Sequence, residues 1–379
     1  MHQVIASHVV LHISLIDGVG PKACATLCEV FADNLHELYL LDLFDLQRRT
    51  GLSQAVCQKI CAGLADKAIL DKEMALIQKH AIFFVTLLDP EYPQLLRQIH
   101  APPTVLYYKS DSPLQLSPAL AFVGSRKADN YGQQVTQHII PEIVKEGFIT
   151  ISGGALGIDG MVHRETVKAG GRTVAILGSG LLKPYPHAHK GLFDQIVYSG
   201  GFVMSSFPLE FEPLPQNFPA RNRIIAGMSL ATIVIQAAIK SGALLTARNA
   251  LDEGRDVGVV PGSIFNELST GCHELITQGA RAITKTEDIF ELIGYQAKTS
   301  RVPVVKAPSA CPSKPIQTVS PDKRRKDSLL TLCITPKSTD YLLAQAGLSF
   351  DKLQERLWQL QIEGQLEQNI LGQWKAVDR

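Results

Sequence analysis

The most restrictive feature of the sequence is an alternation of apolar runs and helical patterns that begins at Ala119. Six short runs rich in β-branched residues are each followed by a segment with helical spacing; they read LAFVG, FITISGG, TVAILG, GFVMSS, ATIVIQ and DVGVVPG. Each run is almost continuously apolar, as expected for strands buried on both faces. Such alternation builds a parallel sheet covered by helices. The sequence therefore predicts an α/β protein with an extended Rossmann-like, doubly wound, mostly parallel sheet.

Four regions of the chain differ in composition and in hydrophobic periodicity. Residues 1–75 show helical periodicity throughout and predict a small helical domain. Residues 76–297 contain the α/β alternation. Residues 298–327 are rich in proline and basic residues, which predicts a linker. Residues 328–379 return to helical spacing and predict a separate C-terminal domain.

Turn signals divide the first two regions further. Within the helical region they fall at Asp17–Pro21 and Thr50–Ser53. The turn IDGVGPKA, Ile16–Ala23, has the form of a helix-hairpin-helix or SAM-like domain, in which backbone N–H groups can meet a phosphate. A plain helical hairpin that needs glycine for its turn is an equal alternative. Ahead of the predicted sheet, the prolines of Asp89–Tyr108 predict an irregular connector.

The C-terminal region predicts three short helices followed by a small hairpin around Asn369–Gly372, which is the order of a winged helix. Its third helix, 349–363, carries Asp351, Glu355 and Glu363 against two basic residues. A helix that reads DNA normally presents a basic face. A module that contacts protein is therefore at least as good an interpretation as a DNA reader.

Charge and cysteine content exclude several classes of protein. Lys and Arg number 37 and Asp and Glu 36, so a polyanion site must come from local clustering. Seven cysteines argue against a disulfide framework. Cys24/Cys28 and Cys57/Cys61 fall in helical segments, which favours buried helix faces over zinc ligands. No membrane-spanning stretch and no signal-peptide pattern are present, so we expect a cytoplasmic protein without membrane contact.

Basic residues and glycines follow the predicted strands at their carboxyl ends, where a doubly wound sheet binds its ligands. Glycine-rich turns there expose N–H groups that can hold a phosphate. Five strand ends carry six basic residues, which favours a ligand with repeated anionic groups. The candidate binding residues are Ser125, Arg126, Lys127, Gly153, Gly154, Lys183, Arg221, Asn222, Arg223 and Lys240.

Catalysis has less support in the sequence. Asp159 and His163 are four residues apart on one helix and could form an acid–base pair. The alternative, which we favour, is that Asp159 caps the helix while His163 is buried against the sheet. No GxxxxGK[ST] loop, GxGxxG turn or metal-spaced cluster is present. We therefore expect no catalytic residue, no metal and no cofactor.

Eight motifs in register resemble one family, the DprA or Smf DNA-processing proteins of bacterial natural transformation. They lie between about Asp89 and Ala282 and include VGSR, SGGALGIDGMVH, FPARNRIIAG and SGALLTARNA. The resemblance implies a dimeric protein that binds single-stranded DNA in a basic pocket made of the ten candidate residues. It also implies that the protein loads RecA onto that strand.

The chain departs from the family pattern at Ser206 and near Gln236, where members usually have Glu, and at His189 and His273, where they tend to have Asn. These changes leave the pocket more positive and argue against a catalytic carboxylate. Two other functions remain open. One is a nucleotide phosphoribohydrolase-like enzyme that uses the same phosphate-binding crevice through Asp159 and His163. The other is a regulator that reads duplex DNA through residues 328–379.

Overall fold

The computed structural model describes residues 2–32, 34–296, 328–333, 335, 337, 339–346, 350–368 and 373–377. The chain forms two compact units, 1–303 and 304–379. The expected linker 298–327 and the expected hairpin turn Asn369–Gly372 lie outside the described residues.

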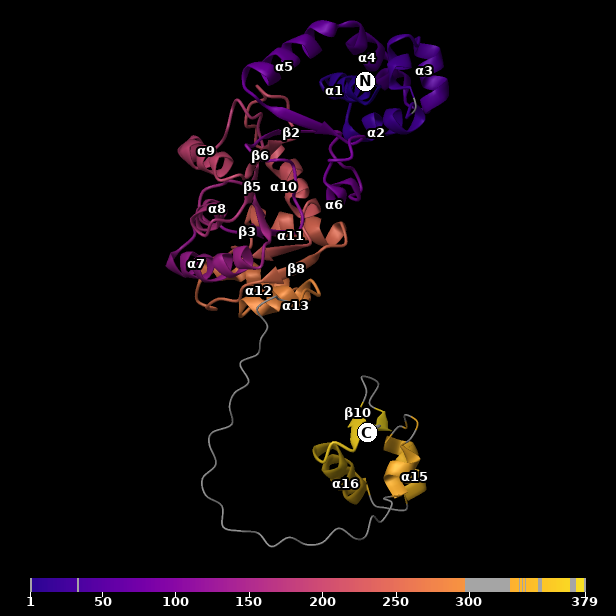
Figure 1. Ribbon diagram of the computed structural model, residues 1–379, viewed down its shortest axis with the longest axis vertical. Coiled ribbons are helices and arrows are strands. Elements are labelled where there is room, and N and C mark those ends of the chain that lie inside the picture. Colours follow the sequence, from indigo (N-terminus) through magenta and orange to yellow (C-terminus); the bar gives the residue numbers. More distant parts are fainter. Residues whose placement is uncertain are drawn as a thin grey trace. The chain divides into compact units, whose positions relative to one another are not determined.

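A nine-stranded sheet organises the first unit (Figure 1), in the order β1-β2-β6-β5-β4-β3-β7-β8-β9. Strands β3 to β9 pair with one another only in parallel, whereas β2 is antiparallel to both of its neighbours, β1 and β6. The predicted mixed α/β fold with a mostly parallel sheet is confirmed. The strands are β1 (Phe83–Thr86), β2 (Val105–Lys109), β3 (Ala119–Val123), β4 (Ile149–Ser152), β5 (Thr173–Ile176), β6 (Phe202–Ser205), β7 (Ala231–Val234), β8 (Asp256–Val259) and β9 (Arg281–Ala282).

All six predicted strands are present, as β3 to β8. The irregular connector expected over Asp89–Tyr108 is wrong in part, because it contains helix α6 (Gln94–Arg97) and most of β2. Prolines stop just before Val105, so they do not interrupt the ladder. The strands β1 and β9 were also not predicted, because short strands at the edges of a sheet show little sequence pattern.

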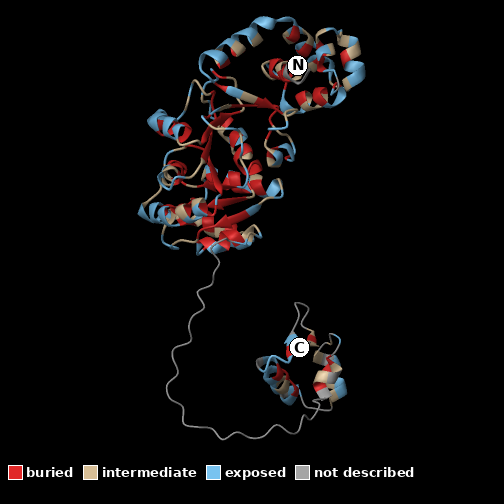
Figure 2. Ribbon diagram, viewed as in Figure 1, coloured by how far each residue is buried: buried red, intermediate tan, exposed pale blue. Residues whose placement is uncertain are grey.

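Helices cover both faces of the sheet because side chains alternate along each strand. On β3, Leu120 and Phe122 pack with α7 (Asn130–Lys145), α8 (Ile158–Lys168) and α13 (Thr286–Leu292). Ala119, Ala121 and Val123 face α10 (Asn217–Gly227), α11 (Gly242–Asp252) and α12 (Thr270–Thr277). Helix α9 (Lys190–Tyr198) packs beside β5 and β6. The buried residues form a continuous layer along the sheet (Figure 2).

Among the described residues, five α-helices precede the sheet and lie at its β1 end (Figure 1). They are α1 (His2–Ser14), α2 (Pro21–Val30), α3 (Leu43–Thr50), α4 (Gln54–Ala65) and α5 (Lys67–Lys79), with a 3₁₀ turn η1 (Leu35–Tyr39) between α2 and α3. Both predicted turns are confirmed. Helix α2 starts with Pro21, and α3 ends at Gly51 with a φ of 68°, a conformation that favours glycine.

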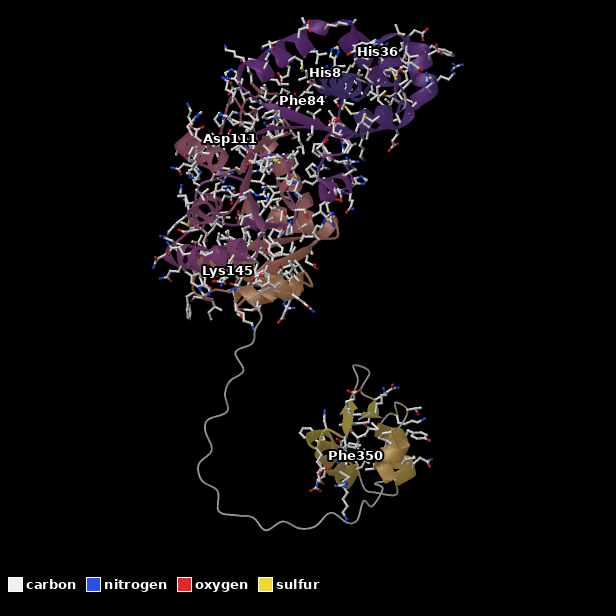
Figure 3. The ribbon with its side chains drawn as sticks, viewed as in Figure 1. His8, His36, Phe84, Asp111, Lys145 and Phe350 are labelled. Carbon is white, nitrogen blue, oxygen red and sulfur yellow. The ribbon has the colours of Figure 1, made fainter. Side chains whose placement is uncertain are left out.

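The helices share a core with the antiparallel edge of the sheet. Val105 and Tyr107 of β2 belong to the same buried cluster as Leu11 and Leu27. The His8 ring of α1 lies 6.1 Å from the Phe84 ring of β1, and both are labelled where the helices meet the sheet (Figure 3). Cys24, Cys28 and Cys57 are buried in this core and Cys61 is partly buried, as expected for helix faces.

The second unit contains three helices and a two-stranded antiparallel sheet within its described residues. Leu353, Leu357 and Trp374 belong to its own buried core. The elements are α14 (Ser328–Leu332), α15 (Thr339–Ala346), α16 (Phe350–Ile362), β10 (Leu366–Gln368) and β11 (Trp374–Ala376).

Candidate nucleic-acid interface

A cavity of about 560 Å³ lies at the carboxyl ends of the strands, where β3 and β7 are neighbours. The strand order reverses direction between these two strands, and such a switch point is where open α/β sheets bind their ligands. Ala121 of β3 pairs with both Ile151 of β4 and Thr232 of β7, so the loops that follow diverge and leave a crevice. The cavity is lined by Ser125, Arg126, Lys127, Asp159, Phe218, Arg221, Asn222, Lys240, Thr246 and Leu268, among others.

The loop after β3 is held by backbone hydrogen bonds that leave its cations in solvent. The Ser125 amide donates to the Gln236 carbonyl at 2.7 Å, and the Ile158 amide donates to the Ser125 carbonyl at 3.1 Å. The Ser125 Oγ also accepts from the Lys127 amide at 3.1 Å. Arg126 and Lys127 are exposed beside it. A fixed backbone with free cationic side chains suits a phosphate ligand.

A second set of contacts fixes the position of this loop from distant parts of the chain. The Asp129 carboxylate accepts from the side-chain Nε2 of Gln236 at 2.8 Å and from the side-chain Nδ2 of Asn266 at 2.7 Å. The same carboxylate accepts from the Gly132 amide at the start of α7. Loops after β3, β7 and β8 are thereby joined at one edge of the sheet.

The glycine-rich turn after β4 encloses a buried carboxylate. Asp159 is 7% exposed, and its Oδ2 accepts from the Gly153 amide at 3.1 Å and the Ala155 amide at 3.3 Å. A Cβ on Gly153 would collide with Arg221 and Asp159, so only glycine fits there. Burial raises the pKa of Asp159, and the charge of Arg221 opposes that rise.

Arg221 is a buried cation that also lines the cavity. It is 4% exposed, and its Nη1 donates to the carbonyls of Gly153 and Ile176, the latter at 2.6 Å. Burial lowers its pKa to about 10. Its Nε is buried without a hydrogen-bond partner in the part of the chain that the structure describes. Arg221 therefore ties the ends of β4 and β5 together while lining the cavity.

The remaining candidates are divided among several places. Asn222 and Lys240 line the cavity, and Lys240 is exposed. Arg223 lies outside it and donates to the Ala101 carbonyl at 2.6 Å. Lys183 lines a different cavity beside α9 and pairs with Glu212 at 2.9 Å. Gly154 is buried, with φ of 67°, behind the turn.

Aromatic rings line a small cavity of about 40 Å³ next to the main one. Its lining includes Leu156, Tyr185 and Phe218, together with Arg126 and Arg221. The Phe218 ring lies 5.9 Å from the Tyr185 ring. Phe218 was not among the candidate residues, although it begins the FPARNRIIAG motif. An aromatic residue three positions before the first of two arginines was the signal that could have identified it.

Asp159 and His163 do not form an acid–base pair. His163 is fully buried against the sheet, as expected, and its Nδ1 lies 2.7 Å from the Thr173 Oγ1. Burial lowers its pKa to about 3, so it is neutral at physiological pH. The expected helix cap is wrong in detail: Gly157 is the N-cap of α8, and Asp159 binds the amides of the preceding loop.

Among the described residues, no cluster of histidine, cysteine or carboxylate side chains could hold a metal ion. Within the same residues, no helix is both long and apolar enough to cross a membrane.

Comparison with known proteins points to one family. A family model described as DNA recombination-mediator protein A matches residues 83–294. The chain is 36% identical over 280 residues to the DNA processing protein DprA of Bacillus subtilis, covering 71% of this chain and 94% of that protein. It is 41% identical over 225 residues to DprA of Streptococcus pneumoniae, covering 59% of this chain and 77% of that protein.

Solved structures agree with these sequence relatives. The crystal structure of DprA from Streptococcus pneumoniae matches with a TM-score of 0.65 at 33% identity, covering 75% of this chain and 97% of that one. A structure of DprA from Helicobacter pylori, described for its single-stranded DNA binding mode, matches with a TM-score of 0.50 at 28% identity. It covers 56% of this chain and 97% of the other chain.

Proposed function

The chain belongs to the DNA recombination-mediator protein A family, and from this premise we propose that it binds single-stranded DNA in the crevice between β3 and β7. The observation that carries the proposal is the set of exposed cations around a preformed cavity at the switch point of the sheet. Cations that contact successive phosphates bind a strand regardless of its sequence. The relative from Helicobacter pylori, whose structure is described for this kind of binding, supports the same ligand here.

Within this proposal the candidate residues have two roles. Arg126, Lys127 and Lys240 contact phosphates, since they are exposed at the cavity. Ser125, Asn222 and the turn at Gly153 and Gly154 shape the backbone around them, and Arg221 braces that turn. Arg223 and Lys183 lie outside the crevice, and they contribute to its positive electrostatic potential rather than to direct contacts with the strand.

The biological role that fits this ligand is protection of an incoming strand and loading of RecA recombinase onto it, during natural transformation or recombination in the cytoplasm. We propose that the protein acts as a homodimer. The test is the rate at which RecA coats a single strand with and without the protein. Acceleration supports loading, and an unchanged rate contradicts it.

The proposed domain boundaries follow the four regions of the sequence. We propose that residues 1–75 form a helix-hairpin-helix or SAM-like domain beside a DNA-binding domain of residues 76–297. We also propose that residues 298–327 are a linker and that residues 328–379 are a winged-helix domain. Helices α14 to α16 followed by the β10–β11 pair support the last assignment.

The decisive experiment compares one labelled single strand with its duplex in anisotropy titrations at about 50 mM and about 200 mM salt. Tighter binding of the single strand, weakened by salt, is expected. Equal affinity for the duplex would reject the crevice as the binding site. Incubation with nucleoside monophosphates tests the alternative enzyme, and we expect no release of free base, because Asp159 and His163 are not paired.

A further inference from the structure

The loops beside the crevice expose large apolar side chains. Phe265 is 92% exposed and Ile264 is 76% exposed, in the loop after β8. Ile239, in the loop after β7, is 61% exposed. Single exposed apolar residues are common, but three large ones in two adjoining loops mark a contact surface.

The loop that carries Phe265 is well fixed. The Asn266 side chain donates to Asp129 at 2.7 Å, and the Asn266 amide donates to the Ser263 carbonyl at 3.0 Å. The Phe265 amide donates to the Ser263 Oγ at 3.2 Å. The phenyl ring is therefore presented to solvent by a braced backbone, and a ligand would not have to order the loop on binding.

These side chains adjoin the cationic crevice. Leu268, three residues after Phe265, lines the cavity together with Lys240. Ile239 is the immediate neighbour of Lys240 in the chain. The Gly271 amide donates to the Ala237 carbonyl at 2.8 Å, which joins the two loops. The apolar surface thus continues the Lys240 side of the crevice.

We propose that Phe265, with Ile264 next to it in the chain and Ile239 in the adjoining loop, is a stacking platform for nucleobases of the strand whose phosphates bind Arg126 and Lys240. This inference rests on the proposed function and adds a base-binding subsite to it. A single strand has anionic phosphates along one side and flat apolar base faces along the other. A rim that is cationic at Lys240 and apolar at Phe265 complements both. Stacking on an aromatic ring also tolerates every base.

The test uses the full chain, an oligonucleotide, and an abasic strand of equal length that keeps the phosphates but lacks the bases. We expect Phe265→Ala to weaken binding of the intact strand by about 5- to 150-fold, the range expected for the loss of one stacked base. Binding of the abasic strand should not change. Phe265→Tyr, which keeps a ring, should restore the affinity.

Tyr198→Ala is the matched control. Tyr198 is 89% exposed at the end of α9, just before β6 begins, so it lies at the amino-terminal side of the sheet and away from the crevice. Its removal should leave binding of both strands unchanged. Because Phe265 and Tyr198 are both exposed, neither substitution should disturb folding, which a thermal unfolding curve confirms.

Two results would overturn the platform. One is a Phe265→Ala variant that binds the intact strand as tightly as the unmodified protein. The other is an equal loss on intact and abasic strands together with a lower molar mass by light scattering, which would make the surface an interface between copies of the chain. If the unmodified protein binds neither strand, the proposed function itself fails, which is a different outcome.

Discussion

Two arginines lie against the same phenyl ring and differ in almost every other respect. The Arg126 Cζ lies 5.5 Å from the centre of the Phe218 ring, and the Arg221 Cζ lies 5.8 Å from it. Arg126 is exposed, and no hydrogen bond or ion pair to its side chain occurs within the described part of the chain. Arg221 is buried and donates to two carbonyl groups.

The difference shows that a cation lining the candidate cavity can be open to solvent or bound to the protein scaffold. An exposed guanidinium keeps its donors for a phosphate, and its removal leaves the fold intact. The buried guanidinium of Arg221 instead donates through Nη1 to two backbone carbonyl groups, and its charge offsets a buried carboxylate, Asp159. Substitutions at the two positions should therefore separate binding from stability.

The largest effect is expected for Arg221→Ala. It leaves Asp159 buried without its cation and two carbonyl groups without their donor, so the free energy of unfolding should fall by about 3–5 kcal/mol. Urea denaturation measures this loss. Arg126→Ala is the matched control and should change stability by less than about 0.5 kcal/mol. Equal stability of the two variants would show that Arg221 does not brace the strand ends.

A smaller effect concerns pH and His163. The pKa of His163 is about 3 in the folded protein and 6.5 in the unfolded chain. Between these two pH values the unfolded chain binds a proton that the folded protein excludes. The free energy of unfolding therefore falls as pH drops below 6.5, by up to about 1.4 kcal/mol per pH unit, or about 2 kcal/mol by pH 5.

The variant His163→Asn keeps a donor near Thr173 but cannot titrate. It should be less stable at neutral pH, because it leaves a cavity, yet lose about 2 kcal/mol less between pH 7 and pH 5 than the unmodified protein. His187→Asn, at an exposed position, should keep the full pH dependence. An unchanged slope in His163→Asn would place the acid sensitivity elsewhere.

Binding should respond to the exposed cations. Arg126→Ala and Lys240→Ala are each expected to weaken single-stranded DNA binding about tenfold at low salt, or about 1.4 kcal/mol, for all sequences alike. Each should also reduce the slope of log affinity against log salt by about 0.7, because one phosphate contact is lost. Anisotropy titrations measure both quantities. A loss confined to one sequence would argue against phosphate contacts.

The smallest effect is expected at Lys183. Its ion pair with Glu212, at 2.9 Å, compensates its charge, and it lines a different cavity from Lys240. Lys183→Ala should change the affinity for single-stranded DNA by less than about twofold, since exposed paired charges contribute little. A loss as large as that of Lys240→Ala would show that the strand extends beyond the crevice as far as Lys183.

Most of the central fold could be predicted from the sequence because its signals are local. Continuous apolar runs followed by helical spacing identified β3 to β8, and Pro21 and Gly51 marked helix boundaries. The strand β2 was not predicted, because the prolines just before it indicated an irregular connector. The strands β1 and β9 are too short to show a sequence pattern. An antiparallel edge that packs on helices depends on partners elsewhere in the chain.

The sequence could predict at which edge of the sheet the candidate residues lie, but not the role of each residue. Position after a strand brought Arg126, Arg221 and Lys183 into one list, since every parallel strand ends at the same edge of the sheet. Sequence position does not show how deeply a side chain is buried. The structure placed one of these cations in solvent, one under the turn at Gly153, and one beside Glu212.

The sequence by itself determined the α/β fold, the edge of the sheet that carries the candidate residues, and the family. Each follows from local periodicity or from motifs in register. Only the tertiary structure decided which cations are free and which loops meet. Asp129 contacts Gln236 and Asn266, which lie 107 and 137 residues away along the chain. Burial and hydrogen-bond partners depend on such distant contacts, and these decide whether a charged side chain is available to a ligand.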